Sequence, residues 1–306
     1  MIKGKKDYWF CLYVYCNPPF ENLLVNHILP IIENLLDDDK IKNFFFIRYF
    51  EDGPHIRLRI NFQNTHFLNT SKREIIQRLL NYLELKDASY QSISAPRILK
   101  TKYNPEFERY GGANGIAIAE QIFHFSSVHI LKSIKSNSHW SYSKAMYLAL
   151  SMNYIMISEL IIDSNELCDF YQFSFNRWFP RAYYNHRTGI YDNDIKKGKI
   201  RTYMDLFNRS KVWILPLLNN LSKGKSMQLP YSVFREQIRS VKLSIDIFKE
   251  EMLENSKAKY GLHSIYDSYC HMTNNRLGIR NADESMITFF ILQSLLNGKT
   301  GKTSKS

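Results

Sequence analysis

The first third of the chain alternates short apolar runs with turn residues. Residues 8–17, 43–50 and 55–62 are rich in aromatic and β-branched side chains, which predicts three strands. Only the turn at residues 51–54 separates the second run from the third. So short a connection predicts that these two strands form an antiparallel hairpin.

Helical spacing of apolar positions marks two further segments of this region. Residues 20–36 predict one helix, which Pro30 should kink or split because proline has no backbone N–H to donate. Residues 71–85 predict a second helix, and residues 90–103 an extended segment. The first third is thus predicted to mix helices with strands.

Long apolar-periodic segments dominate the rest of the chain. They predict helices at about 113–135, 141–163, 199–220, 230–254, 261–279 and 283–296. The predicted fold class is therefore α+β, with an N-terminal antiparallel sheet and helices followed by a mainly helical C-terminal part. We expect a single domain over residues 1–297, with a mixed portion at 1–112, a helical portion at 113–297 and a flexible basic tail at 298–306.

The composition favours a folded protein outside the membrane. Of the 306 residues, 44% are hydrophobic, which is enough to bury a sizeable core. No apolar stretch is long enough to span a bilayer, and the N-terminus lacks the apolar region of a signal peptide. We therefore expect a cytosolic protein.

The net charge indicates which ligands the chain attracts, and the cysteine pattern indicates whether it holds a metal. The chain has 41 Lys and Arg against 29 Asp and Glu, and this net charge of +12 attracts polyanions and acidic peptides. Nucleic-acid binding therefore stays open. The four cysteines are scattered without a CxxC pair, and no HExxH sequence occurs, so we expect free buried thiols and no metal site or cofactor.

The third predicted strand carries the first candidate site. Alternation along a strand places His55, Arg57 and Arg59 on one face, and Arg48 of the preceding strand joins them if the hairpin register allows. Two guanidinium groups on one face favour an anionic ligand, because their planar forks bind carboxylates. The alternative is an ordinary solvated face of the sheet.

A glycine-rich turn carries the second candidate site. Glu106 and Arg109 precede two glycines, 111–112, which permit a tight turn before the helix predicted near Ala113. Glu106 is able to orient Arg109 or to act as a base. The alternative is a helix entry with a surface ion pair.

The third candidate site lies late in a predicted helix. His271 and Asn275 are one helical turn apart, and Asp267 precedes His271 by one turn on the same face. An imidazole flanked in this way can be held in one tautomer for proton transfer. The alternative is a buried structural histidine.

The segment Arg177–Arg181, with the sequence RWFPR, also combines cations with aromatic rings. Such a segment is able to bind a peptide or nucleic acid. The alternative interpretation, which the sequence favours, is the end of an amphipathic helix.

Taken together, these segments resemble the C-terminal domain of lantibiotic dehydratases, which also occurs alone in thiopeptide-type bacteriocin biosynthesis proteins. The resemblance rests on WFCLYVYCN, FFFIRYFEDGPHIRLRI, NPEFERYGG and CHMTNNRLGI, in that order, and extends from about Tyr8 to Leu296. It implies a bacterial enzyme that removes glutamate from glutamylated Ser or Thr of a precursor peptide. The products would be dehydroalanine and dehydrobutyrine.

The resemblance also implies site residues and partners. Catalytic roles fall on Arg57, Arg59, Glu106, Arg109 and His271, and we assign substrate binding to Arg48, His55 and Asn275. The implied partners are the leader and core of the precursor peptide and a separate enzyme that attaches glutamate from glutamyl-tRNA. A homodimer is also an expectation from the family.

Two other functions compete with elimination. Some members of the same family close a pyridine-type ring by a formal [4+2] cycloaddition on residues that are already dehydrated. A module without catalytic activity, binding a leader peptide or nucleic acid, is the second alternative. Presence of the arginines, Glu106 and His271 favours elimination, because elimination releases a carboxylate that arginines can bind.

Overall fold

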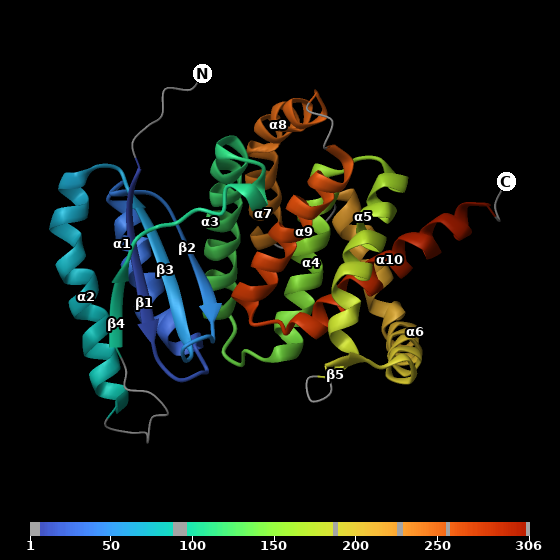
Figure 1. Cartoon of the computed structure of the whole chain (residues 1–306), viewed down its shortest axis with the longest axis horizontal. Coiled ribbons are helices and arrows are strands. Elements are labelled where there is room, and N and C mark those ends of the chain that lie inside the picture. Colours follow the sequence, from blue (N-terminus) through green and yellow to red (C-terminus); the bar gives the residue numbers. More distant parts are fainter. Residues whose placement is uncertain (1–6, 88–96, 186–188, 225–228, 255–257, 304–306) are drawn as a thin grey trace. The chain divides into compact units, whose positions relative to one another are not determined.

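A computed structural model describes residues 7–87, 97–185, 189–224, 229–254 and 258–303 (Figure 1). The chain divides into two compact units, Met1–Trp140 and Ser141–Ser306. The first unit holds the sheet and the second is mainly helical, so the predicted α+β class is confirmed.

Four antiparallel strands form the sheet of the first unit, in the order β2-β3-β1-β4. They are β1 (Tyr8–Tyr15), β2 (Ile41–Tyr49), β3 (His55–Phe62) and β4 (Arg97–Thr101). The predicted hairpin of β2 and β3 is confirmed. Strand β4 falls in the predicted extended segment 90–103, of which residues 90–96 lie outside the described residues.

Helices connect these strands in a β-α-β-β-α-β order, the split arrangement of ferredoxin-like folds. The connecting helices are the π-helical η1 (Leu23–Ile28), α1 (Leu29–Asp37) and α2 (Thr65–Asp87), and the short η2 (Glu108–Tyr110) and α3 (Ala113–Lys135) follow the last strand. Pro30 was predicted to kink or split this helix, but the helical backbone continues without a break and changes from the π-helical η1 to α1 just before Pro30. Helix α2 begins six residues before the predicted start at 71, where the side chain of Asn64 accepts the backbone N–H of Phe67.

The sheet has two unlike faces. Leu12, Leu58 and Ile60 lie on one face and are fully buried. The other face carries the arginines of β3, and α3 packs against it where the ring of Phe123 lies 5.3 Å from that of Phe45. Helices α2 and α3 lie on opposite sides of the sheet (Figure 1). Helix α3, which the sequence assigned to the helical portion, therefore belongs to the compact unit of the sheet.

The second unit is built mainly from helices. They are α4 (Tyr142–Leu160), α5 (Ser164–Trp178), η3 (Phe179–Ala182), α6 (Asn193–Lys223), α7 (Leu229–Ser240), α8 (Lys242–Glu254), α9 (Ala258–Leu277) and α10 (Asn281–Thr303). The short strands β5 (Tyr184–Asn185) and β6 (Ile190–Tyr191) pair between η3 and α6.

Three of these elements differ from the sequence prediction. Only the end of helix α5 was predicted, at Arg177–Arg181, and this is confirmed; its start was missed, although the side chain of Asp163 caps it by accepting two backbone N–H groups. The predicted helix 230–254 is two helices that meet at Val241. Helix α10 continues to Thr303, because a helix with a buried first part extends at little cost, so most of the expected tail is helical rather than irregular.

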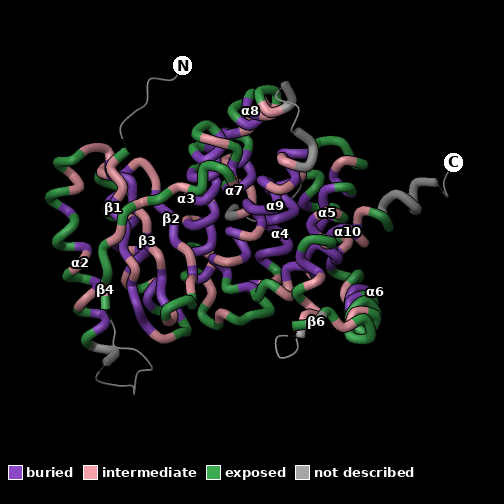
Figure 2. Tube along the Cα trace, in the orientation of Figure 1, coloured by how far each residue is buried: buried purple, intermediate pink, exposed green. Residues whose placement is uncertain are grey.

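Helix α4 is buried along most of its length at the centre of the second unit (Figure 2). All four cysteines, Cys11, Cys16, Cys168 and Cys270, are buried free thiols, as predicted. In the described part of the chain, no helix combines the length and apolar character needed to cross a membrane.

Candidate active site

The arginines of β3 lie on one sheet face, as the alternation predicts. In the register, Arg57 is opposite Tyr13 and Ile47, and Arg59 is opposite Cys11 and Phe45. The register therefore places the ring of Tyr13 beside Arg57 and the ring of Phe45 beside Arg59.

Rings and a histidine hold Arg57 in place. Its Cζ lies 3.3 Å from the ring centroid of Tyr49 and 4.6 Å from that of Tyr13. Its Nε donates to Nε2 of His55 at 3.2 Å, and Nδ1 of His55 lies 2.8 Å from the carbonyl oxygen of Gly53. Because Nε2 accepts, we assign the His55 proton to Nδ1, where it is donated to Gly53.

His55 was predicted to bind substrate, but the structure gives it a supporting place. It is only 1% exposed, and both of its ring nitrogens have partners. Desolvation lowers the pKa of His55, and the charge of Arg57 lowers it further. A neutral His55 therefore orients Arg57 rather than carrying charge itself.

Arg59 rests on rings as well. Its Cζ lies 5.1 Å from the ring centroid of Tyr103 and 5.3 Å from that of Phe45. The hydroxyl of Tyr103 in turn donates to Oε1 of Glu120 at 2.6 Å. Glu120 is 8% exposed, and burial raises its pKa to about 7, although the Tyr103 hydrogen bond and Arg59 oppose the shift.

Sequence reasoning missed Glu120. The signal was present, because Glu120 is a single carboxylate inside the apolar run GIAIAEQIF of α3. A charged residue on the buried face of a helix usually has a partner, and here the partner is Tyr103.

Arg48 does not join the other arginines. The register pairs Arg48 with Ile56, so its side chain lies on the opposite face of the sheet. There it is 7% exposed and forms an ion pair with Glu21 at 2.9 Å, while desolvation lowers its pKa. Its predicted role in substrate binding is not supported, because a buried, paired guanidinium has little freedom to bind a ligand.

The glycine-rich turn has the predicted geometry. Gly111 and Gly112 adopt positive φ angles of 79° and 100°, which favour glycine, and α3 begins directly after them. Nη1 of Arg109 donates to Oε2 of Glu106 at 3.4 Å. Glu106 is 60% exposed, so both the orienting role and the surface ion pair predicted for it agree with this contact.

In the second unit, His271 lies on α9 between an indole and a carboxylate. Its ring stacks on that of Trp178, with centroids 4.6 Å apart and planes at 18°. Its Nδ1 is 2.8 Å from Oε1 of Glu284 on α10. Glu284 is 1% exposed, and its Oε2 accepts from the side-chain amide of Asn274 at 3.0 Å.

Asp267 has a different role from the one predicted. Its two carboxylate oxygens each accept from the indole Nε1 of Trp178 at 3.1 Å, and they also bind Ser174 and Arg177. Burial raises the pKa of Asp267 to about 6 against these hydrogen bonds. Asp267 thus fixes Trp178, and Glu284, which sequence reasoning missed, is the carboxylate that contacts His271.

Asn275 follows His271 by one turn on α9 and is half-buried. Its predicted role in substrate binding stays a prediction. Within the described ranges, no group of three or more His, Cys, Asp or Glu side chains is placed to hold a metal ion.

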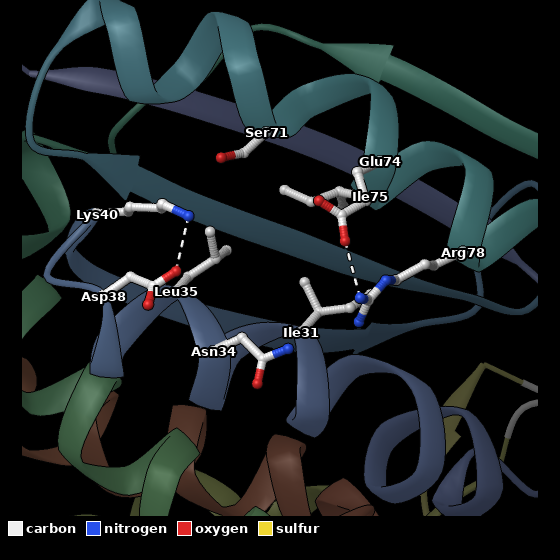
Figure 3. Close-up of a pocket in the computed structure, with 9 residues that line it drawn as sticks. All are labelled: Ile31, Asn34, Leu35, Asp38, Lys40, Ser71, Glu74, Ile75 and Arg78. Atoms are coloured by element: carbon white, nitrogen blue, oxygen red, sulfur yellow. Dashed lines mark hydrogen bonds and ion pairs between the residues drawn. The ribbon is translucent and has the colours of Figure 1, made fainter.

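A separate hollow lies between α1 and α2 in the first unit (Figure 3). Its volume is about 110 Å³, and its charged side chains form two ion pairs, Lys40 with Asp38 and Arg78 with Glu74. It contains none of the predicted site residues.

Comparison with curated proteins finds relatives in lantibiotic biosynthesis. The chain is 24% identical over 283 residues to the subtilin biosynthesis protein SpaB of Bacillus subtilis, which covers 90% of this chain and 24% of that protein. It is 24% identical over 298 residues to the nisin biosynthesis protein NisB of Lactococcus lactis subsp. lactis. This match covers 94% of this chain and 25% of that protein. The chain spans about a quarter of the length of these curated relatives.

Two solved structures share the fold. The pyridine synthase TbtD, from thiomuracin biosynthesis, matches with a TM-score of 0.69 and 13% identity over 94% of this chain and 98% of that chain. The tRNA-dependent lantibiotic dehydratase MibB from Microbispora sp. 107891 matches with a TM-score of 0.64 and 16% identity over 99% of this chain and 29% of that chain. At these identities the likeness establishes the fold alone.

A family model extends over both units. The model described as the C-terminal part of lantibiotic biosynthesis dehydratases matches residues 9–295, from β1 into α10. This range contains every predicted site residue, and it confirms the resemblance found in the sequence. The chain therefore belongs to the family of lantibiotic dehydratase C-terminal domains.

Proposed function

We propose that this chain removes glutamate from glutamylated Ser or Thr residues of a precursor peptide. One observation carries the proposal: among the described residues, Arg57 and Arg59 form no ion pair and rest on aromatic rings instead. Their charge is therefore available to an anionic ligand, and elimination releases a carboxylate.

Elimination needs a base for the weakly acidic Cα proton of the glutamylated residue. His271 suits this task, because Nδ1 faces the Glu284 carboxylate and is assigned as the donor of that hydrogen bond. Nε2 is then the nitrogen with a free lone pair. It takes the Cα proton, the electron pair forms the Cα–Cβ double bond, and the Cβ–O bond breaks to release glutamate.

Cations lower the barrier of this reaction by stabilising negative charge where it develops. Arg57, Arg59 and Arg109 serve the developing enolate and the departing carboxylate. Such groups are most effective when they are fixed in advance, and the rings around Arg57 and Arg59 provide this. Glu106, three residues before Arg109, orients that guanidinium through their ion pair.

The substrate must arrive already glutamylated. A separate enzyme that uses glutamyl-tRNA is the proposed source, and the leader and core of the precursor peptide are the proposed ligands of this chain. Both partners occur in the cytoplasm of bacteria, which is the proposed location. A homodimer is part of the proposal through the family alone.

Pyridine formation by a [4+2] cycloaddition is a second candidate. The fold shared with the pyridine synthase TbtD, over 98% of that chain, is compatible with this reaction. A cycloaddition has no carboxylate to release, so it gives the arginines of β3 no leaving group to bind.

Mass spectrometry separates the candidates. Purified protein is incubated with a synthetic peptide that carries glutamylated Ser, and in parallel with a peptide that contains two dehydroalanines. Loss of glutamate from the first peptide supports elimination. Cyclisation of the second peptide, with the first unchanged, rejects elimination in favour of cycloaddition, and two unreacted peptides that still bind indicate a module without catalytic activity.

A further inference from the structure

The segment Arg177–Arg181 extends from the end of α5 into η3, and its Trp178 lies against His271. The Trp178 ring is stacked on His271 at 4.6 Å. The buried Asp267 fixes this indole through Nε1 and also pairs with Arg177 at 3.3 Å. The ring is therefore a rigid surface next to the imidazole.

Arg181 lies over the same indole. Its Cζ is 5.0 Å from the Trp178 ring, so His271 and Arg181 are neighbours of one aromatic group. Arg181 is exposed, and in the part of the chain that the structure describes it has no hydrogen bond or ion pair. Arg177, four residues earlier, instead binds both Asp267 and Ser264.

We propose that Arg181 and Trp178 form a binding site for the free carboxylate of the glutamyl group, beside His271. The indole excludes water from one side of the guanidinium, which strengthens its interaction with an anion. A planar guanidinium fork matches a carboxylate in two-point geometry. The inference rests on the proposed function and names a substrate contact outside the arginines that the family resemblance supplied.

Direct binding tests this site without turnover. The probe is glutarate, a dicarboxylate, with neutral glutaramide of the same length as its control. Binding is followed by the NMR signal of the Trp178 indole N–H, which the spectrum of Trp178→Phe identifies. Glutarate should shift this signal saturably, and glutaramide should not.

Arg181→Gln should weaken glutarate binding about tenfold, the lower end of what a hydrogen bond to a charged group contributes. Arg181→Lys should keep part of the affinity because it keeps the charge. Arg209→Gln is the matched control, since Arg209 is exposed on α6 of the same unit. Equal glutarate affinity in Arg181→Gln and the unaltered protein, or an equal shift with glutaramide, would overturn the site.

Kinetics then separate the site from the proposed function. With glutamylated peptide, Arg181→Gln should raise KM while kcat changes little, because a contact made equally in ground and transition states affects binding alone. If the unaltered protein binds glutarate through Arg181 but releases no glutamate, the elimination proposal fails and the carboxylate site stands. If elimination proceeds and Arg181→Gln leaves both KM and glutarate affinity unchanged, the site is rejected and elimination stands.

Discussion

The arginine-bearing face of β3 and the α9–α10 helix pair differ in whether their charged side chains are paired with other side chains. On the sheet, Arg57 and Arg59 rest on aromatic rings and form no ion pair among the described residues. In the helix pair, the buried Glu284 is bonded to His271 and Asn274. The first region offers charge to a ligand, whereas the second fixes the position of a proton.

The physical reason lies in the two kinds of scaffold. Neighbouring strands bring side chains on one face within about 5 Å, so rings flank each arginine of β3. A carboxylate buried between helices is tolerated only when hydrogen bonds satisfy its oxygens, which Asn274 and His271 do for Glu284. The anion binding and the proton transfer proposed for this chain therefore depend on two different kinds of scaffold.

Removing the imidazole should have the largest effect. His271→Ala takes away the proposed base, and we expect glutamate release to fall about 10²–10⁴-fold while the glutamylated peptide accumulates. Single-turnover mass spectrometry measures the loss. Undiminished release would mean that the helix pair has no part in proton transfer.

Removing a sheet cation should come next. Arg59→Ala should slow glutamate release about 10²–10³-fold, because one preorganised donor to the developing charge is lost. Arg48→Ala is unsuitable as a control, since Arg48 is buried and paired with Glu21. Arg73→Ala on α2 is a suitable control because Arg73 is exposed. This variant should release glutamate at the rate of the unaltered protein. Equal rates for the Arg59 and Arg73 variants would contradict the proposed role of the sheet face.

Neutralising the partner of the imidazole should have a smaller effect. Glu284→Gln keeps the size of the side chain but loses the charged acceptor for Nδ1, and we expect kcat to fall about 10–100-fold with little change in KM. The ¹⁵N signals of His271 should also lose the single-tautomer pattern. A variant that retains both that pattern and its kcat would show that Glu284 only fills space.

The last expected effect concerns stability and leaves activity unchanged. The folded-state pKa of Glu120, about 7, lies above the usual 4.5, so the folded unit binds the proton more tightly than the unfolded chain. The free energy of unfolding of the first unit should therefore fall as pH rises from 4.5 through about 7, by an amount on the order of 3 kcal/mol.

Glu120→Gln should remove this pH dependence and stabilise the first unit at pH 8, since Gln still accepts from Tyr103. Hydrogen exchange of the β1 and β3 amides at pH 5 and pH 8 measures the stability of the first unit at each pH. The exposed Glu84→Gln on α2 is the control. An unchanged pH profile in the Glu120 variant would mean that this carboxyl is already solvated in the folded unit.

The local pattern of residues determined several features of the fold. The period of two along β3 placed Arg57 and Arg59 on one face, and the short turn before it required the hairpin. Two adjacent glycines predicted the positive φ angles before α3. These features depend on neighbours in the chain, so the sequence is sufficient to find them.

Tertiary structure decided the rest, because it depends on contacts between distant residues. The hairpin register, with Arg48 opposite Ile56, turned Arg48 to the buried face. The packing of α10 on α5 and α4 brought Glu284, rather than Asp267, to His271. Helical periodicity states which side of a helix is buried, but the partner that meets each buried carboxylate is fixed only when the helices pack.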